Sequence, residues 1–197
     1  MRETKRVKSV KGTQTEKNLL AAFAGESQAR NRYTYFASQA RKEGFEQISA
    51  IFLETADNEK EHAKVFFAFL ADGLAEITAE YPAGKVGSTA ENLKAAAEGE
   101  KLEWGTLYPR FEKTAEEEGF KEVAMRFKEI GEVESYHERR YLKLLENVEN
   151  GSVFKKDTPV KWKCRNCGYV HEGVEAPNVC PACSHPQSFY EVWVENY

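Results

Sequence analysis

Apolar residues recur every three to four positions from residue 13 to about residue 150, and proline is almost absent from this stretch. This spacing puts apolar side chains on one face of a helix, so it predicts long amphipathic helices rather than strands. We expect four of them: Thr13 to Gly44, Phe45 to about Asp72, Ser88 to Gly119, and about Phe120 to Val148.

The ends of these helices carry recognisable signals. Thr13 and Ser88 are each followed three residues later by glutamate, which is the pattern of a capping box. Gly44 and Gly119 stand where a helix would end in a left-handed residue. The links at these glycines are short and predict antiparallel helix pairs, whereas the connection between the second and third helices is long enough to cross a bundle.

After Gly151 the sequence changes to short apolar pieces, turn residues and four cysteines. We therefore divide the chain into an N-terminal extension over residues 1–12, a helical bundle over 13–150 and a small β-rich metal-binding domain over 151–197. The basic stretch between Arg2 and Lys11 is expected to be a frayed, solvated end, because no apolar segment follows it that would make a secretory signal.

Charge and hydropathy exclude several classes of protein. The 197 residues include 28 basic and 32 acidic side chains, and the net charge of −4 indicates neither a nucleic-acid nor a membrane-surface partner. No apolar run approaches the ~20 residues that span a bilayer. All four cysteines lie between residues 164 and 183, which favours a metal site in a reducing compartment over scattered disulfides. We expect a cytoplasmic protein.

The two helix pairs resemble each other in sequence. At an offset of 75 residues Gly44 matches Gly119, Phe52 matches Phe127 and Glu54 matches Glu129, while Gly25-Glu26 matches Gly99-Glu100 at an offset of 74. The third helix therefore contains one extra residue. An internal duplication explains these matches and predicts a bundle with pseudo-two-fold symmetry. Chance similarity between amphipathic helices is the alternative.

The same offset relates two Glu-x-x-His motifs, Glu59 with His62 and Glu134 with His137. Residues three apart on a helix share a face, so each motif presents a carboxylate and an imidazole together. Oxygen and imidazole nitrogen ligands suit iron, manganese or zinc. Helix bundles that hold two metal ions add one glutamate from each remaining helix. The duplicated positions that supply these glutamates are Glu26 and Glu100, and Glu103 follows Glu100 on the same face.

A charge count supports this assignment. Glu26, Glu59, Glu100, Glu103 and Glu134 would together carry a charge of about −5, which a protein core does not tolerate without partners. Two ferrous ions supply about +4 and make the cluster tolerable, while a metal-free site would be strained and partly protonated. The alternative is that these glutamates lie on solvated helix faces, as most glutamates do.

The cysteines form two pairs, Cys164-x-x-Cys167 and Cys180-x-x-Cys183, separated by twelve residues. Two such turns can place four thiolates around one metal ion, and the set suits either zinc or iron. Iron is favoured because a two-metal redox centre in the same chain needs a supply of electrons. Trp162, Tyr169, Phe189 and Trp193 are expected to form the small core, while His171 and His185 are expected at the surface and not as ligands.

The segment from Glu26 to Tyr33, the Glu59-Lys60-Glu61-His62 motif and the cysteine pairs together resemble the rubrerythrin family, from about residue 12 to the end of the chain. The resemblance implies a ferritin-like four-helix bundle followed by a rubredoxin-like domain. It also implies a di-iron centre with bridging carboxylates Glu59 and Glu134, one iron that moves between His62 and Glu103, and a four-thiolate iron. The implied di-iron ligands are Glu26, Glu59, His62, Glu100, Glu103, Glu134 and His137, and those of the third iron are Cys164, Cys167, Cys180 and Cys183.

In the family, tyrosines that match Tyr33 and Tyr108 donate hydrogen bonds to ligand glutamates; ordinary core packing is the alternative for both. Tyr33 follows Glu26 by seven residues and shares its face, but Tyr108 follows Glu100 by eight. A π-bulge between Glu100 and Pro109 would absorb the extra residue and restore the phase of the helix.

The resemblance implies a non-haem di-iron peroxidase that reduces hydrogen peroxide to water and takes part in oxidative-stress defence. Electrons would pass from the four-thiolate iron, in a neighbouring subunit of a homodimer or higher oligomer, to the di-iron site. A separate reductase that draws on NAD(P)H would supply them. Two alternatives stay open at this point: a ferroxidase or iron-storage protein, and a zinc-ribbon interaction protein whose helices only pack.

Overall fold

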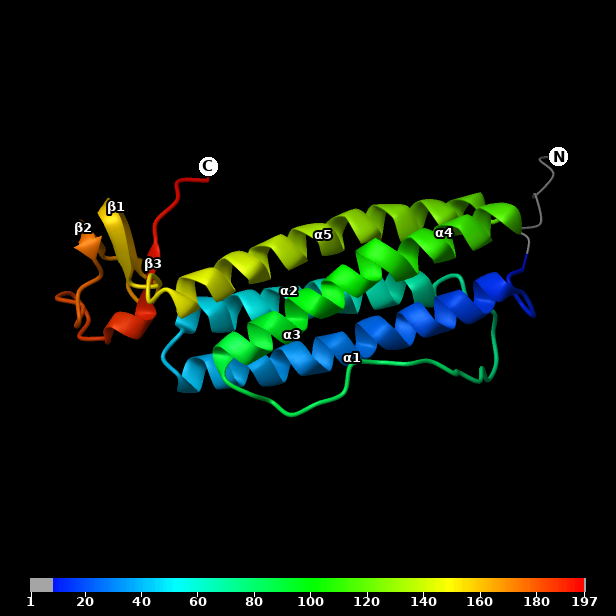
Figure 1. Ribbon diagram of the computed structural model, residues 1–197, viewed down its shortest axis with the longest axis horizontal. Coiled ribbons are helices and arrows are strands. Elements are labelled where there is room, and N and C mark those ends of the chain that lie inside the picture. The colour runs from blue at the N-terminus through cyan, green and yellow to red at the C-terminus, as the bar shows by residue number, and fades with distance from the viewer. Residues whose placement is uncertain (1–8, 197) are drawn as a thin grey trace. The chain divides into compact units, whose positions relative to one another are not determined.

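The computed structural model describes residues 9–196, and Figure 1 shows the order of their helices and strands. The chain is mainly helical, as predicted, and a small sheet follows the last long helix. The elements are α1 (Gln14–Lys42), α2 (Glu46–Phe67), α3 (Thr89–Leu102), the π-helix η1 (Glu103–Leu107), α4 (Tyr108–Glu117), α5 (Lys121–Glu149), β1 (Lys155–Cys164), β2 (Val170–Glu175), the 3₁₀-helix η2 (Gln187–Phe189) and β3 (Tyr190–Val192).

These elements form two compact units, which we treat separately. Within the described residues the first unit comprises 9–31, 56–83 and 98–138, and the second comprises 32–55, 84–97 and 139–196. Several long helices contribute one part to each unit. The domain boundaries expected at residues 12 and 150 stay predictions.

The core of the first unit is aromatic. Phe66 and Phe127 stack with ring centroids 4.9 Å apart, and Tyr108 and Phe111 pack edge-on or tilted against them. Burial of each such ring contributes roughly 1.5–3 kcal/mol. Val10 is only 4% exposed and belongs to this core, so the expectation of a solvated end is wrong at that residue. The rest of that expectation, residues 1–8, lies outside the described part of the chain.

The second unit contains the three-stranded antiparallel sheet, in which β1 lies between β2 and β3. Its small core surrounds Trp162, which is fully buried, and Tyr169 and Phe189 pack against it as predicted. Trp193 does not join this core; instead Lys161 Nζ lies 5.1 Å from the centre of its ring. Tyr190 and Phe154 complete the core, and the sequence reasoning missed both.

The two glycine turns use the same hydrogen bonds. Gly44 has φ +84° and Gly119 has φ +81°, a region that side chains with a Cβ rarely adopt. At the first turn Phe45 N–H donates to the Ala40 carbonyl, and at the second Phe120 N–H donates to the Ala115 carbonyl. This is the Schellman motif, and its recurrence at an offset of 75 residues agrees with the predicted duplication.

The duplication also places a glutamate before each glycine turn. In the second unit Glu43 Oε2 accepts a hydrogen bond from the backbone N–H of Thr89, at the start of α3. In the first unit Glu118 Oε2 accepts from both the N–H and the hydroxyl of Thr15, at the start of α1. Each glutamate therefore satisfies a free N–H group at the start of another helix.

Three details differ from the sequence expectations. Helix α2 ends at Phe67 rather than near Asp72, because the following N–H groups of Phe69 and Leu70 bond three residues back and tighten the chain into a turn. The expected third helix is interrupted by η1. The capping box at Ser88 forms fully, whereas at Thr13 the glutamate side chain accepts from Gly12 instead.

Candidate metal centres

Four carboxylates and two imidazoles of the first unit converge in two overlapping groups. In each group four ligand atoms lie within 4.8 Å of one another. One group contains Glu26, Glu59, His62 and Glu134, and the other contains Glu59, Glu100, Glu134 and His137. The structure thus brings together six of the seven residues expected around two irons.

The two groups are related by the duplication. The offset that matches Glu59 to Glu134 also matches His62 to His137, and Glu26 corresponds to Glu100, so one group maps onto the other. Glu59 and Glu134 belong to both groups. A carboxylate shared by two ligand sets can place one oxygen on each of two ions, so the geometry agrees with the bridging role expected for this pair.

The helices explain how these side chains meet. Each Glu-x-x-His motif spans one turn of a helix, on α2 or α5. The carboxylate and the imidazole of a motif therefore lie on the same face of their helix. The Nδ1 atom of His62 lies 3.0 Å from Glu59 Oε2 and 2.8 Å from Glu134 Oε1. The Nδ1 atom of His137 lies 2.7 Å from Glu134 Oε2 and 3.3 Å from Glu59 Oε1. Both imidazoles therefore face the two shared carboxylates.

These carboxylates are buried to an extent that is rare for ionisable groups. Glu26 and Glu134 are 0% exposed, and Glu59 and Glu100 are 1% exposed. An unpaired carboxylate in such surroundings is strongly unfavourable. The buried negative charge therefore favours the binding of cations at this site.

The hydrogen bonding of the ligand atoms tests whether metal ions fit. Among the described residues, neither oxygen of Glu134 has a hydrogen-bond partner, and the same holds for Glu26 Oε2, Glu59 Oε1 and His137 Nδ1. His62 Nδ1 has one such partner, Glu59 Oε2 at 3.0 Å, whereas His137 Nδ1 lies 2.7 Å from Glu134 Oε2 without the geometry of a hydrogen bond. Atoms that approach closely but do not pair are arranged as ligands around an ion, so the residues fit a two-metal site.

The metal-free cluster shifts the ionisation of its members. Burial, together with the charge of Glu59, raises the pKa of Glu26 to about 7, although His62 opposes the shift. Burial lowers the pKa of His137, but the close, negatively charged carboxylates of Glu134 and Glu59 outweigh it and raise that pKa to about 9. The pKa of His62 rises for the same reasons, with Glu134, Glu26 and Glu59 as partners. Without metal ions, protons bound to these residues therefore offset part of the negative charge of the carboxylates.

Glu103 lies beside the groups but belongs to neither. It is the first residue of η1 and is only partly buried. Its Oε1 lies close to α1, 3.8 Å from the point where a Cβ on Gly25 would stand. Desolvation, followed by the charges of Glu26, Glu134 and Glu59, raises the pKa of Glu103 well above its usual value. It therefore lies within electrostatic reach of the site without joining it.

The predicted π-bulge is confirmed. In η1 the backbone N–H of Tyr108 donates to the carbonyl of Glu103, five residues back, and this wider turn absorbs the extra residue of the third helix. The Tyr108 side chain is buried, and its hydroxyl donates a hydrogen bond to Oε1 of Glu26. Tyr108 thus contacts a ligand-type glutamate, as expected.

Tyr33 lies in the second unit and is 2% exposed. It packs against Phe36, Phe52 and Tyr141, with its ring centroid 5.6 Å from that of Tyr141. Core packing therefore accounts for its burial. A hydrogen bond from Tyr33 to a ligand glutamate stays a prediction.

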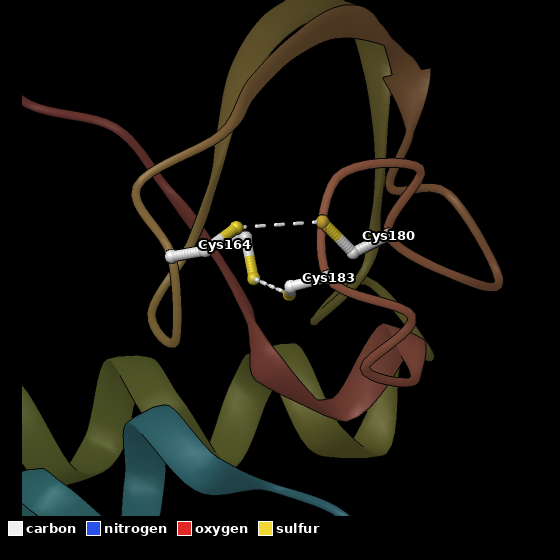
Figure 2. A group of neighbouring side chains, drawn as sticks. Cys164, Cys180 and Cys183 are labelled. Atoms are coloured by element: carbon white, nitrogen blue, oxygen red, sulfur yellow. Dashed lines mark hydrogen bonds between the residues drawn. The ribbon is translucent and has the colours of Figure 1, made fainter.

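The four cysteines meet in the second unit and form no disulfide. Their sulfur atoms lie within 4.8 Å of one another, and Sγ of Cys164 and Cys183, like Sγ of Cys167 and Cys180, are 3.7 Å apart. Figure 2 shows the sulfurs of the two turns facing each other. This group consists of the four cysteines, and the exclusion of His171 and His185 as ligands stays a prediction.

The two cysteine turns have the same backbone structure. Cys164 N–H donates to the carbonyl five residues ahead, and so does Cys180 N–H. Gly168 and Ser184 follow the second cysteine of each turn with φ +79° and +60°. A hydrogen bond from the His185 backbone lowers the pKa of Cys183 to about 6, which favours its thiolate form, whereas the neighbouring thiols raise the pKa of Cys167. The turns are therefore preformed for one tetrahedral ion.

Comparison with known proteins agrees with both sites. The family model of rubrerythrin matches residues 17–145, and that of the rubrerythrin rubredoxin-like domain matches residues 162–191. The chain is 61% identical to the rubrerythrin of Porphyromonas gingivalis, over 100% of this chain and 98% of the relative. It is 57% identical to the rubrerythrin of Clostridium perfringens, over 97% of this chain and 100% of the relative. A structure of fully reduced, all-ferrous nigerythrin superposes with a TM-score of 0.62 at 33% identity, covering 96% of this chain and 89% of that one.

The fold and the two sites define a class: a ferritin-like helical bundle with a carboxylate–histidine site of the di-iron type, joined to a rubredoxin-like domain with a four-cysteine iron site. The chain belongs to the rubrerythrin family, whose members are generally oxidoreductases. No helix in the described part of the chain is long and apolar enough to cross a membrane.

Proposed function

We propose that this protein reduces hydrogen peroxide to water at a di-iron centre held by the two carboxylate–histidine groups. The observation that carries the proposal is the sharing of Glu59 and Glu134 between the two groups, beside a seventh candidate ligand, Glu103. We infer the complete ligand set to be Glu26, Glu59, His62, Glu100, Glu103, Glu134 and His137.

The overall reaction consumes one peroxide, two electrons and two protons and yields two water molecules. When bound, two ferrous ions supply both electrons at one place, so the O–O bond can break without release of a radical. The chain's own residues orient the ions and manage the protons. Glu59 and Glu134 would contribute to holding both ions, and His62 and His137 would complete the two ligand sets.

One residue is suited to proton transfer, and a second orients a ligand. Burial and the nearby carboxylate charges raise the pKa of Glu103 well above its usual value, which favours the protonated form that can act as a proton donor. It is the least buried of the five acidic residues and can take up a proton again from solvent. Tyr108 keeps the Glu26 carboxylate oriented through their hydrogen bond. Burial, followed by the nearby carboxylate charges, raises the pKa of Tyr108 well above its usual value, so its hydroxyl stays a donor.

The four-cysteine site is the proposed electron donor to the di-iron centre. Its four thiolates suit a single iron that carries one electron at a time. We propose that the site serves the di-iron centre of a neighbouring copy in a homodimer or higher oligomer. A separate reductase that draws on NAD(P)H would reduce it, and we propose that the protein works in the cytoplasm.

Stopped-flow oxidation of the anaerobically reduced, iron-loaded protein tests the proposal. We expect hydrogen peroxide to oxidise the di-iron centre faster than dioxygen does, and Cys164→Ser to leave that first oxidation intact while it abolishes repeated turnover. Oxidation by dioxygen at the higher rate would instead support a ferroxidase. A colourless purified protein that contains zinc in the four-cysteine site would contradict the electron-transfer role.

A further inference from the structure

The π-helix η1 is tied to α5 at one side chain, Trp104. Its indole N–H donates a hydrogen bond of 2.7 Å to Glu138 Oε2. Trp104 directly follows Glu103, and Glu138 directly follows His137. The bond therefore links the neighbours of two candidate metal ligands across two helices, 34 residues apart in sequence.

Trp104 is held from a second side as well. Lys101 Nζ lies 3.9 Å from the centre of the indole ring, a separation that favours a cation–π contact. No residue of η1 is fully buried, and Leu107 at its end packs against the core, so the two contacts of Trp104 add to the restraint of the segment next to Glu103.

There is also space for the indole to move. Trp104 lines a hollow of about 320 Å³ between η1, α4 and α5, together with Tyr108, Phe127 and Gly131 among others. Gly131 lines the α5 side of this space, where a Cβ would be in ordinary van der Waals contact with Tyr108 Cβ, 3.6 Å away. A tryptophan released from Glu138 could enter the hollow without displacing the core.

Glu103, the residue before Trp104, is the candidate ligand that lies outside both ligand groups. Glu103 belongs to neither ligand group, yet the charges of Glu26, Glu134 and Glu59 act on it. Glu103 is the first residue of η1, so a shift of η1 would move its carboxylate relative to the site. We propose that the Trp104–Glu138 hydrogen bond is a latch that holds η1 in the position where Glu103 stays outside the metal-ligand groups. Trp104 is thus a positioning residue, and this role rests on the proposed part of Glu103 as a ligand.

Binding of Mn²⁺ tests the latch without any peroxide chemistry. Mn²⁺ prefers oxygen and nitrogen ligands to thiolates, and its free-ion EPR signal reports how much remains unbound. If the latch holds Glu103 away, Trp104→Phe should release it and tighten Mn²⁺ binding by about tenfold, the opposite of the loss of affinity seen when a group that orients a metal ligand is removed. Glu138→Ala should do the same, while Glu138→Gln keeps an acceptor for the indole and should have a smaller effect.

A double variant separates the latch from a general structural effect. In a Glu103→Gln background, Trp104→Phe should leave Mn²⁺ affinity unchanged, because the residue on which the latch acts is gone. Trp193→Phe is the matched control, since that tryptophan also lies beside a lysine but far along the sequence in the cysteine-bearing segment. Hydrogen exchange in the metal-free protein should be faster over residues 102–108 in Trp104→Phe.

Two results would overturn the latch. One is an unchanged or weaker Mn²⁺ affinity in Trp104→Phe, and the other is an equal change with and without Glu103. Neither result depends on peroxide turnover, so a failure of the latch and a failure of the proposed peroxidase activity can be told apart.

Discussion

The hydroxyl of Tyr108 donates a hydrogen bond to Oε1 of Glu26, which lies 82 residues earlier in the chain. The other oxygen of Glu26 has no hydrogen-bond partner in the described part of the protein. One oxygen is therefore fixed by a neutral donor, and the other is left to face His62 and the metal site. The contact exists only because η1 turns Tyr108 toward Glu26.

Loss of this donor should weaken metal binding. We expect Tyr108→Phe to reduce Mn²⁺ affinity by roughly 10–100-fold, the range found when a group that orients a metal ligand is removed. Titration followed by the free Mn²⁺ EPR signal measures this. Tyr35→Phe, at an exposed tyrosine of α1, is the control and should bind Mn²⁺ normally. Equal affinities in Tyr108→Phe and the control would show that the hydrogen bond does not orient Glu26.

The four-cysteine site should account for visible colour and for repeated turnover. We expect Cys164→Ser to lose the absorption of the ferric thiolate site, because one of four sulfur ligands is replaced by a poorer one. Helical circular dichroism should stay near that of the parent, since the helices do not depend on this residue. Absorption spectra and iron analysis test both points. Full colour in Cys164→Ser would mean that Cys164 is not a ligand.

The stability of the metal-free protein should fall as the pH rises from about 5 to 9. Glu26 has an ordinary pKa of 4.5 when unfolded and about 7 when folded, so the folded state holds an extra proton that it loses as the pH passes through 7. The raised pKa of His137, about 9, likewise gives stability that is complete below 6.5 and lost as the pH rises through 9. The shift of Glu26 alone corresponds to about 3 kcal/mol.

Thermal unfolding of the metal-free and metal-loaded forms across this pH range tests the prediction. The loaded form should not lose stability toward alkaline pH, because metal ions replace the protons and are bound more tightly when the ligands are deprotonated. The gain in melting temperature on loading should therefore grow with pH. A gain that is constant from pH 5 to 9 would show that Glu26 and His137 are not protonated in the metal-free fold.

The cap supplied by Glu118 should contribute measurably to stability. Glu118 accepts hydrogen bonds at the start of α1 from Gln14 N–H and from Thr15, so Glu118→Ala leaves helix N–H groups without this acceptor. We expect a loss of roughly 1–2 kcal/mol in the free energy of unfolding, as for other helix caps. Chemical denaturation measures it. Glu117→Ala, at the exposed neighbouring glutamate, should cost less than about 0.5 kcal/mol.

Several features followed from sequence alone because they depend on local spacing. The Glu-x-x-His motifs place their side chains on one helix face by geometry, and the glycines at positions 44 and 119 end helices because only glycine adopts φ > 0 without cost. The extra residue between Glu100 and Tyr108 required a π-turn, and η1 is that turn. The cysteine spacing likewise predicted the four-thiolate group.

Other features needed the folded chain, because they join residues whose separation in sequence carries no periodic signal. No pattern links Tyr108 to Glu26, Trp104 to Glu138 or Glu118 to Thr15. Val10 and Tyr190 are buried although their local sequence suggests a chain end and a loop. The position of Glu103 outside both ligand groups is likewise a tertiary result. Sequence by itself determined which residues could be ligands, since that depends on type and helical phase. Only tertiary packing decided which of them meet, because burial and long-range hydrogen bonds select one arrangement of the helices.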